Sequence, residues 1–436
     1  MTFIVVFPGK CSARPVRPPV GGVSRSEGME GSRARLRSSP VPSDTLADVP
    51  PRTILYTGKG GVGKTSVAAA TAADCASRGH RTLVLSTDPA HSLSDALETE
   101  LGPEPKEVAP GLWGQEISVA EGVERNWDRV SAWLGDVLAG KGVDRVRAEE
   151  LTVPPGMDEL FSLLEIGRHW KEEAFDVLVV DCAPTAETIK LLGFPEVAEW
   201  WMEKVFPWNR NLLSTAAPLA RALDIALPDP EMVEQVEQVV EQLVEMDAIL
   251  KDGERTSIRL VMNPDRMVIN ESRRTFALLS LYGYGTDAVV VNRIFPEEVE
   301  GTYFAAWRER QESDLAEVTD AFAPVPVLTA RYFDREVRGS VMHDELAREL
   351  FGDLDPAAIL GEGRGREMVR EDGRTVIRIP VPFASGEDLG LSRQGDELTV
   401  TLGDLRRTII VPSGLRGRDP TRASLEDGSL EILYED

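Results

Sequence analysis

The chain has 436 residues but few cysteines, no long apolar run and a deficit of basic residues. Its three cysteines, Cys11, Cys75 and Cys182, lie far apart and form no C-x-x-C pair, so neither a disulfide framework nor a thiolate zinc site is predicted. No apolar run reaches the ~20 residues of a membrane-spanning helix. Lys and Arg number 48 against 73 Asp and Glu, a formal net charge of −25. This charge argues against nucleic acid as the main partner.

The first 50 residues differ in composition from the rest of the chain. They are rich in Pro, Gly and Ser and carry a small net positive charge. The short apolar stretch at residues 3–7 has no basic residue before it, so it does not fit a signal peptide. We expect residues 1–50 to form a disordered arm; the alternative interpretation is that translation starts at Met29.

Beyond residue 51 the pattern predicts two different kinds of structure. Short apolar runs first alternate with helical stretches, which is typical of a parallel sheet in an α/β domain spanning residues 51–360. The composition changes near the glycine-rich residues 361–365, which we interpret as a flexible hinge. Short strands punctuated by Pro, Gly and Asp follow, and they predict a small all-β sandwich over residues 366–436.

Residues 58–66 are the most informative motif in the chain. They read Gly-Lys-Gly-Gly-Val-Gly-Lys-Thr-Ser and fit G-x-x-x-x-G-K-[ST], the phosphate loop of nucleoside triphosphatases. An apolar strand precedes the loop and an alanine-rich helix follows it, so an unliganded glycine turn is the weaker interpretation. Glycines let backbone N–H groups approach phosphate oxygens, and the helix N-terminus adds positive potential. The predicted nucleotide-binding residues of the loop are Gly58, Lys59, Gly60, Gly61, Val62, Gly63, Lys64, Thr65 and Ser66.

Two aspartates at the ends of predicted strands complete the chemistry that phosphoryl transfer needs. Lys64 would bridge the β- and γ-phosphates, and Thr65 would hold Mg²⁺ together with Asp181, the latter through a water. Asp88 could orient or deprotonate the attacking water; alone, the dipeptide Asp88-Pro89 would also suit a simple turn. Switch-like turns are therefore expected at these two strand ends, and they comprise Asp88, Pro89, Asp181, Pro184 and Thr185.

Three segments together resemble the arsenite-pump and tail-anchored-protein-targeting ATPases, which are dimeric and have a deviant phosphate loop. They are residues 58–65, 86–95 and 181–185, and residues 155–159 and 336–339 match as well. The resemblance covers about residues 52–351. It implies a homodimer that uses ATP and Mg²⁺, with Lys59 reaching the partner's nucleotide. Lys59, Lys64 and Asp88 would then be catalytic, and Asn292 would contact adenine.

The stretch of residues 191–250 reads as a helical insertion in the α/β domain. Targeting members of the family build a groove for a transmembrane helix at this place, and adaptable methionines with broad aromatics suit such a surface. The alternative is that these side chains are the core between helices. The expected groove residues are Trp200, Trp201, Met202, Phe206, Trp208, Met232 and Met246.

The C-terminal part resembles an α-crystallin, or small heat-shock, domain. The resemblance rests on residues 405–412 and 423–432, where an Asp-Gly pair between apolar residues also indicates a hairpin. Such a domain could hold apolar segments or serve as an inert cap.

The leading hypothesis is a cytoplasmic, transiently membrane-associated ATPase that binds and releases hydrophobic, tail-anchored segments. ATP would close its homodimer, and a peripheral membrane receptor would take the client. One alternative is an ATPase that drives an arsenite efflux partner, against which the lack of a three-cysteine cluster counts because As(III) prefers thiolates. Another is a nucleotide-dependent switch without a client. No zinc is expected, because the C-x-x-C pair of the eukaryotic targeting factors is missing.

Overall fold

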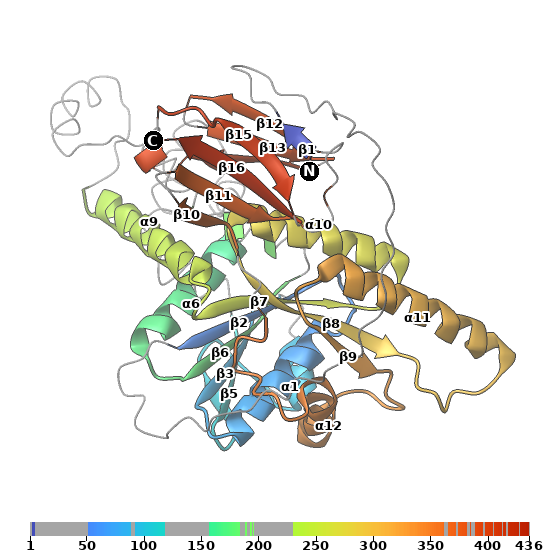
Figure 1. The fold of residues 1–436 in the computed structure, drawn as a ribbon. Helices are drawn as coiled ribbons and strands as arrows, with labels where there is room; N and C mark the ends of the chain where they lie inside the picture. Colours follow the sequence, from blue (N-terminus) through green and yellow to red (C-terminus); the bar gives the residue numbers. More distant parts are fainter. Residues whose placement is uncertain are drawn as a thin grey trace, which may run out of the picture.

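The computed structural model describes residues 51–88, 92–117, 157–183, 230–361 and most of 365–435, with Thr2–Ile4 and a few positions between 188 and 195. Within this part of the chain an α/β layer carries an all-β layer on one side (Figure 1). This arrangement confirms the fold class that the sequence predicts.

The α/β layer is built on a sheet of eight strands. All neighbouring strands are parallel except β4, which runs antiparallel to β5 at one edge. The strand β2, which leads into the phosphate loop, is central and lies between β6 and β7. In spatial order the strands are β4 (Lys106–Ala109), β5 (Leu112–Glu116), β3 (Thr82–Ser86), β6 (Val177–Asp181), β2 (Arg52–Thr57), β7 (Thr256–Met262), β8 (Thr286–Ile294) and β9 (Val327–Arg331).

Helices cover both faces of this sheet, so its central strands are buried throughout, as continuous apolar runs predict. One face carries α1 (Lys64–Ser77) and α12 (Gly339–Phe351), which pack on each other, with the short α2 (Ser92–Leu97) beside them. The other face carries α6 (Met157–Glu172), α9 (Pro230–Lys251), α10 (Arg266–Tyr282) and α11 (Thr302–Phe322) (Figure 1).

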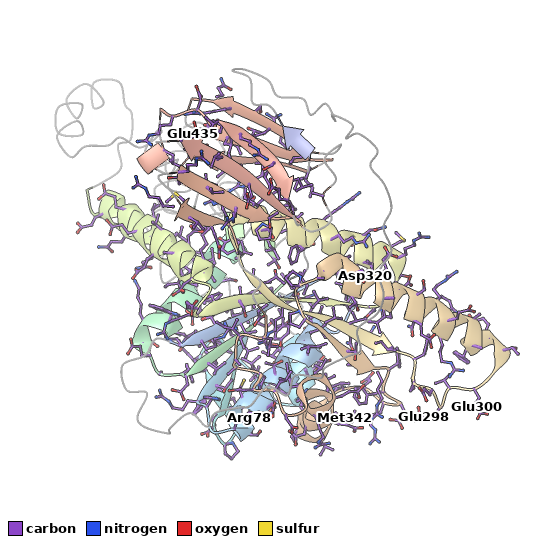
Figure 2. All side chains as sticks on the ribbon, viewed as in Figure 1. Arg78, Glu298, Glu300, Asp320, Met342 and Glu435 are labelled. Atoms are coloured by element: carbon purple, nitrogen blue, oxygen red, sulfur yellow. The ribbon has the colours of Figure 1, made fainter. Side chains whose placement is uncertain are left out.

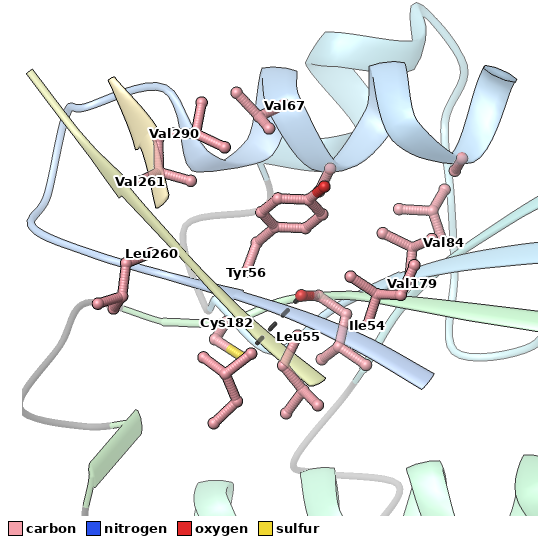
Figure 3. Packing of buried hydrophobic residues seen from close by; sticks show 14 of the residues in the cluster. Ile54, Leu55, Tyr56, Val67, Val84, Val179, Cys182, Leu260, Val261 and Val290 are labelled. Carbon is pink, nitrogen blue, oxygen red and sulfur yellow. Dashed lines mark hydrogen bonds between the residues drawn. The ribbon is translucent and has the colours of Figure 1, made fainter. Parts of the chain in front are cut away.

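Small side chains let α1 lie close on the sheet. Its buried face consists largely of alanines that are fully removed from solvent. Tyr56 of β2 points its ring at this helix (Figure 3), and its hydroxyl lies 2.7 Å from the hydroxyl oxygen of Thr71. The phosphate loop is therefore held between a strand and a helix that are both rigidly packed.

The all-β layer consists of two antiparallel sheets that enclose a second apolar core. One sheet has the order β1–β15–β16–β11–β10 and the other β12–β13–β14. Ala277 and Leu281 of α10 belong to this second core, so the sandwich packs on the α/β layer through that helix. Its strands are β10 (Glu367–Glu371), β11 (Arg374–Pro380), β12 (Leu389–Gln394), β13 (Glu397–Leu402), β14 (Leu405–Ile410), β15 (Arg422–Glu426) and β16 (Ser429–Glu435).

Two features differ from the sequence-based expectations. Thr2–Ile4 forms strand β1 on the edge of β15, although a disordered arm is predicted there. The edge of β15 offers unpaired backbone groups, and this segment supplies a β-branched and aromatic partner. Both ends of the expected hinge are also tightly packed: a Cβ on Gly361 would lie 2.3 Å from Cδ of Pro326, and one on Gly365 would lie 2.1 Å from the carbonyl oxygen of Gly283.

Charged side chains lie on the periphery of both layers, because an unpaired charge is costly to bury. Glu298 and Glu300 lie near the tip of the loop before α11, Asp320 lies on α11, and Glu435 lies at the end of β16 (Figure 2). No helix among the described residues combines the length and apolarity needed to cross a bilayer.

Candidate active site

The phosphate loop leaves β2 in a conformation that requires glycine at two positions. A Cβ on Gly58 would lie 2.1 Å from the carbonyl oxygen of Val261 in β7. Gly63 has a φ of 95°, and a Cβ there would lie 2.4 Å from Nδ2 of Asn292. The first glycine thus lets the loop pass the neighbouring strand, and the second lets it turn into α1 against the end of β8.

Thr65 and Asp181 meet at the carboxyl end of the sheet. The Thr65 hydroxyl donates a hydrogen bond of 2.7 Å to Oδ2 of Asp181, and it lies 3.1 Å from the hydroxyl of Ser92. Asp181 is wholly buried, and this burial raises its pKa to about 7; the Thr65 hydrogen bond and the Lys64 charge oppose the rise, and the Asp88 charge adds to it. The sequence predicts this pairing, and the structure brings the two side chains together.

The same pair fits a hard divalent cation. Oδ1 of Asp181 is buried and has no hydrogen-bond partner among the described residues. Carboxylate and hydroxyl oxygens are the ligands that Mg²⁺ prefers, and an unpaired buried carboxylate oxygen is costly without a positive partner. Thr65 and Asp181 are therefore the residues that would hold Mg²⁺ here.

A cavity of about 800 Å³ opens beside these residues, large enough for a nucleotide. Lys64 lines it and is almost fully buried, and Asp88 faces it from the end of β3. The Lys59 ammonium instead lies 3.3 Å from Oε2 of Glu271 on α10, with both side chains about 40% exposed. The residues around the cavity are Gly60, Gly61, Gly63, Lys64, Thr65, Ser66, Asp88, Ser92, Asp95, Ala96, Asn292, Arg293, Arg331, Tyr332, Phe333, Asp334, Arg335, Glu336, Val337, Arg338 and Leu346.

The end of β8 closes one side of the cavity with direct contacts to the phosphate loop. The side-chain amide of Asn292 donates to the carbonyl oxygen of Val62 at 2.9 Å, and the Arg293 guanidinium donates to that of Gly61 at 2.8 Å. The same guanidinium lies 5.9 Å from the centre of the Tyr332 ring. Sequence reasoning singled out Asn292 but missed Arg293 and the cavity wall over residues 331–338; the family-like residues 336–339 were the one signal for that wall.

Several predicted residues lie outside the described part of the chain. They are Pro89, Pro184, Thr185, Trp200, Trp201, Met202, Phe206, Trp208 and the side chain of Met232. Met246 is described, and it is only 1% exposed: its Sδ packs at Gly167 of α6, 3.4 Å from where a Cβ would stand. In this structure Met246 is therefore a core residue, because α9 buries that face against α6.

Comparison with known proteins agrees with this geometry. The family described as anion-transporting ATPases matches residues 51–352, which include the whole cavity. The chain belongs to this family. A second family, described as the HSP20-like domain found in ArsA, matches residues 372–433 in the β-sandwich. Both resemblances drawn from the sequence are thereby confirmed.

Relatives of the chain include proteins named as arsenical pump-driving ATPases and proteins named as GET3-type ATPases. A protein of Chlorobaculum tepidum named "Putative arsenical pump-driving ATPase" is 37% identical over 388 residues, which cover 88% of this chain and 96% of the relative. "ATPase GET3B" of Arabidopsis thaliana is 26% identical over 75% of this chain and 87% of the relative. "ATPase get3" of Aspergillus terreus is 30% identical over 66% and 87%. Family membership makes the chain an ATPase, as the phosphate loop predicts.

The described thiols of this ATPase are poor metalloid ligands. Cys75 lies inside α1 and is buried, and Cys182 follows β6 and is buried among apolar side chains (Figure 3). Burial raises the pKa of the Cys75 thiol to about 12 and raises that of Cys182 further. Because the thiolate is the form that binds soft metals, neither residue supplies such a ligand in this fold.

Proposed function

We propose that the protein is a homodimeric, Mg²⁺-dependent ATPase that binds hydrophobic segments of membrane proteins and releases them when ATP is hydrolysed. The observation that carries the catalytic part is the pairing of Thr65 and Asp181 beside a nucleotide-sized cavity. The different positions of the two lysines of the phosphate loop support the dimeric part, since Lys64 is buried at the cavity and Lys59 is partly exposed.

In the proposed reaction the loop backbone and Lys64 would hold the β- and γ-phosphates, and Thr65 with Asp181 would hold the metal. Mg²⁺, when bound, neutralises charge that develops on the phosphate oxygens. Asp88 lies at the cavity, just after β3, which neighbours the strand β6 that ends in Asp181. There its carboxylate accepts a proton from the attacking water or orients that water. All of these groups lie at the carboxyl end of the sheet.

Lys59 is the residue we assign to the dimer. Its side chain is half exposed and pairs with Glu271, whereas Lys64 is buried at the cavity. An exposed ion pair exchanges partners at little cost, because such pairs contribute only about 0–1 kcal/mol. Lys59 is thus free to leave Glu271 for a phosphate bound to a second copy of the chain.

The client part of the proposal rests on the insertion over residues 191–250 and on the family resemblance. The insertion is rich in tryptophan and methionine at its start. Its described helix α9 buries Leu243 and Met246 and exposes a face with Glu234, Glu241 and Glu245. A client groove would therefore be formed by the residues that precede α9.

An ATPase that drives an arsenite efflux partner is the second candidate, and the name of the Chlorobaculum tepidum relative favours it. Burial of Cys75 and Cys182, which raises the pKa of both thiols, counts against a thiolate site built from them. This candidate predicts that As(III) or Sb(III) stimulates ATP hydrolysis. A switch without a client predicts neither stimulation nor capture of a hydrophobic segment.

The test uses Asp88→Asn, which we expect to bind ATP normally and to lose turnover by roughly 10²–10⁴-fold. This variant would be co-expressed with a substrate that bears a C-terminal transmembrane helix, and the two would be purified with ATP. We expect one complex, which disperses when ATP is removed or when Lys59→Ala is added. Normal turnover of Asp88→Asn would overturn the assigned role of Asp88. An active ATPase without any complex would refute the client, and arsenite stimulation would then favour the pump.

A further inference from the structure

Glu116 is a buried carboxylate at the carboxyl end of β5 that the proposed reaction does not use. Its side chain is nearly inaccessible, with 6% of the residue exposed. Oε1 accepts a hydrogen bond of 2.9 Å from the backbone N–H of Ser94, and Oε2 accepts one of 2.9 Å from the Ser94 hydroxyl. The Ser94 oxygen in turn accepts from the N–H of Leu101 at 3.1 Å. Glu116 therefore ties the first turn of α2 to the sheet with both carboxylate oxygens.

This tie fixes α2, which begins shortly after Asp88 in the chain. The residues before Asp88 are fixed at β3, where Ser86 is the register partner of Glu116 and its carbonyl oxygen accepts from the N–H of Ile117 at 3.2 Å. The N–H of Asp88 donates to the hydroxyl of Ser86 at 3.2 Å. Asp88 thus lies between two anchors that both lead to the end of β5.

The tie also reaches the metal-binding pair. Ser92 begins α2, two residues before Ser94, and its hydroxyl lies 3.1 Å from that of Thr65. A helix of six residues has little stability of its own, so its position depends on tertiary anchors. A shift of α2 would move the Ser92 contact together with the chain that follows Asp88.

We propose that Glu116 is a positioning residue of the ATPase reaction, which holds α2 so that Asp88 and Ser92 face the phosphates. This inference rests on the proposed role of Asp88. It places Glu116 outside nucleotide binding, because both carboxylate oxygens accept hydrogen bonds from Ser94 of α2 and the side chain does not line the nucleotide cavity. Loss of Glu116 therefore lowers the rate of the chemical step and leaves ATP binding intact.

The experiment measures kcat and KM for ATP with the full chain, and Kd for a non-hydrolysable ATP analogue. Positioning errors of about 1 Å can cost on the order of 10²-fold in rate, so we expect Glu116→Ala to lower kcat by roughly 10- to 100-fold with KM and Kd nearly unchanged. Glu116→Gln should recover part of the rate, because its amide oxygen can still accept from the Ser94 N–H. Ser94→Ala should lower kcat as well, and the double variant should be no slower than Glu116→Ala, since both changes break the same tie.

Asp176→Asn is the matched control. Asp176 accepts from the backbone N–H of Arg81 at 2.8 Å and from its guanidinium at 2.7 Å, and so anchors the opposite, amino end of β3. We expect this variant to lose some stability and to keep its kcat.

Three results would overturn the proposal: a wild-type kcat in Glu116→Ala, an equal loss in Asp176→Asn, or independent effects of Glu116 and Ser94 that multiply. If Glu116→Ala does not fold, Glu116→Gln and Ser94→Ala decide by the same criteria. Asp88→Asn, measured in parallel, tests the proposed function separately: normal turnover there would remove the role of Asp88 whatever Glu116 does.

Discussion

Asp287 is the residue whose loss should destabilise the α/β layer most clearly. It is 2% exposed and pairs with Arg259, whose side chain is fully buried; Nε and Nη2 of Arg259 lie 3.1 and 3.2 Å from its two carboxylate oxygens. Nη2 of Arg52 lies 3.3 Å from Oδ2. The backbone N–H of Leu360 also donates to Oδ2, at 3.2 Å. One carboxylate thus accepts hydrogen bonds from two arginines and from the backbone of the segment that leads to the β-sandwich.

Replacing Asp287 by Asn keeps the shape of the side chain and removes the charge. The Arg259 guanidinium then stays buried without a counter-ion, and one of its hydrogen bonds meets an amide N–H₂ that cannot accept it. Breaking one partner of a buried ion pair typically costs about 3–5 kcal/mol, and we expect a loss of this size. Glu345→Gln is the control, because Glu345 pairs with Arg331 on the surface, where side chains are 35% and 48% exposed, and such pairs contribute at most about 1 kcal/mol.

Urea unfolding followed by tryptophan fluorescence gives a clean measurement. All eight tryptophans precede residue 366, so the signal reports the α/β layer and not the sandwich. We expect a lower midpoint for Asp287→Asn at an unchanged slope. A free energy of unfolding within about 1 kcal/mol of the wild type would refute the reasoning, because it would mean that Arg259 is hydrated or finds another acceptor.

Three further predictions concern the site itself. Burial raises the pKa of Asp181 above its value in the unfolded chain, so the folded apoprotein binds a proton that the unfolded chain releases. The free energy of unfolding should therefore fall by up to about 1.4 kcal/mol per pH unit as the pH rises toward 7. Asp181→Asn should flatten this slope in thermal or urea unfolding, and an unchanged slope would contradict the assignment. Gly63→Ala should abolish ATP-analogue binding, because its Cβ would collide with Asn292 at 2.4 Å; wild-type affinity by calorimetry would show that the loop relaxes. Glu271→Gln should free Lys59 in both protomers and tighten ATP-dependent dimerisation by at most roughly 30-fold, since each of the two exposed ion pairs contributes at most about 1 kcal/mol; weaker dimerisation in analytical ultracentrifugation would argue that the pair itself supports the dimer.

The parts that the sequence could predict depend on local patterns. The phosphate loop is one contiguous motif, and α1 and the apolar strands β3 and β6 follow from hydrophobic runs that the sheet buries on both faces. The strand β13 also follows a local pattern, because its apolar residues alternate with polar ones and turn residues bound it on both sides. Asp88 and Asp181 could be placed together for a related reason: the ends of adjacent parallel strands meet at one edge.

The strand β5 could not be predicted in this way, since its five residues include Gly114, Gln115 and Glu116. Gln115 is fully buried, and only distant residues satisfy it: its amide nitrogen donates to the carbonyl oxygen of Pro103 and to Glu165, and its amide oxygen lies 2.7 Å from His169. Polar side chains of α6 stabilise this strand, and no local sequence pattern predicts them. The positioning role inferred for Glu116 was hidden for the same reason.

The helix α10 makes contacts with both the phosphate loop and the β-sandwich that no sequence motif predicts. Its first half holds Glu271 against Lys59 of the phosphate loop, and its second half contributes Ala277 and Leu281 to the core of the β-sandwich. Near its end, the ring of Tyr282 carries the Arg407 guanidinium of β14 at 3.7 Å. Because a packed helix of 17 residues moves as a rigid element, any nucleotide-linked shift of Lys59 that displaces α10 also displaces the surface on which the sandwich rests. One helix thus contacts both Lys59 of the phosphate loop and the core of the HSP20-like domain.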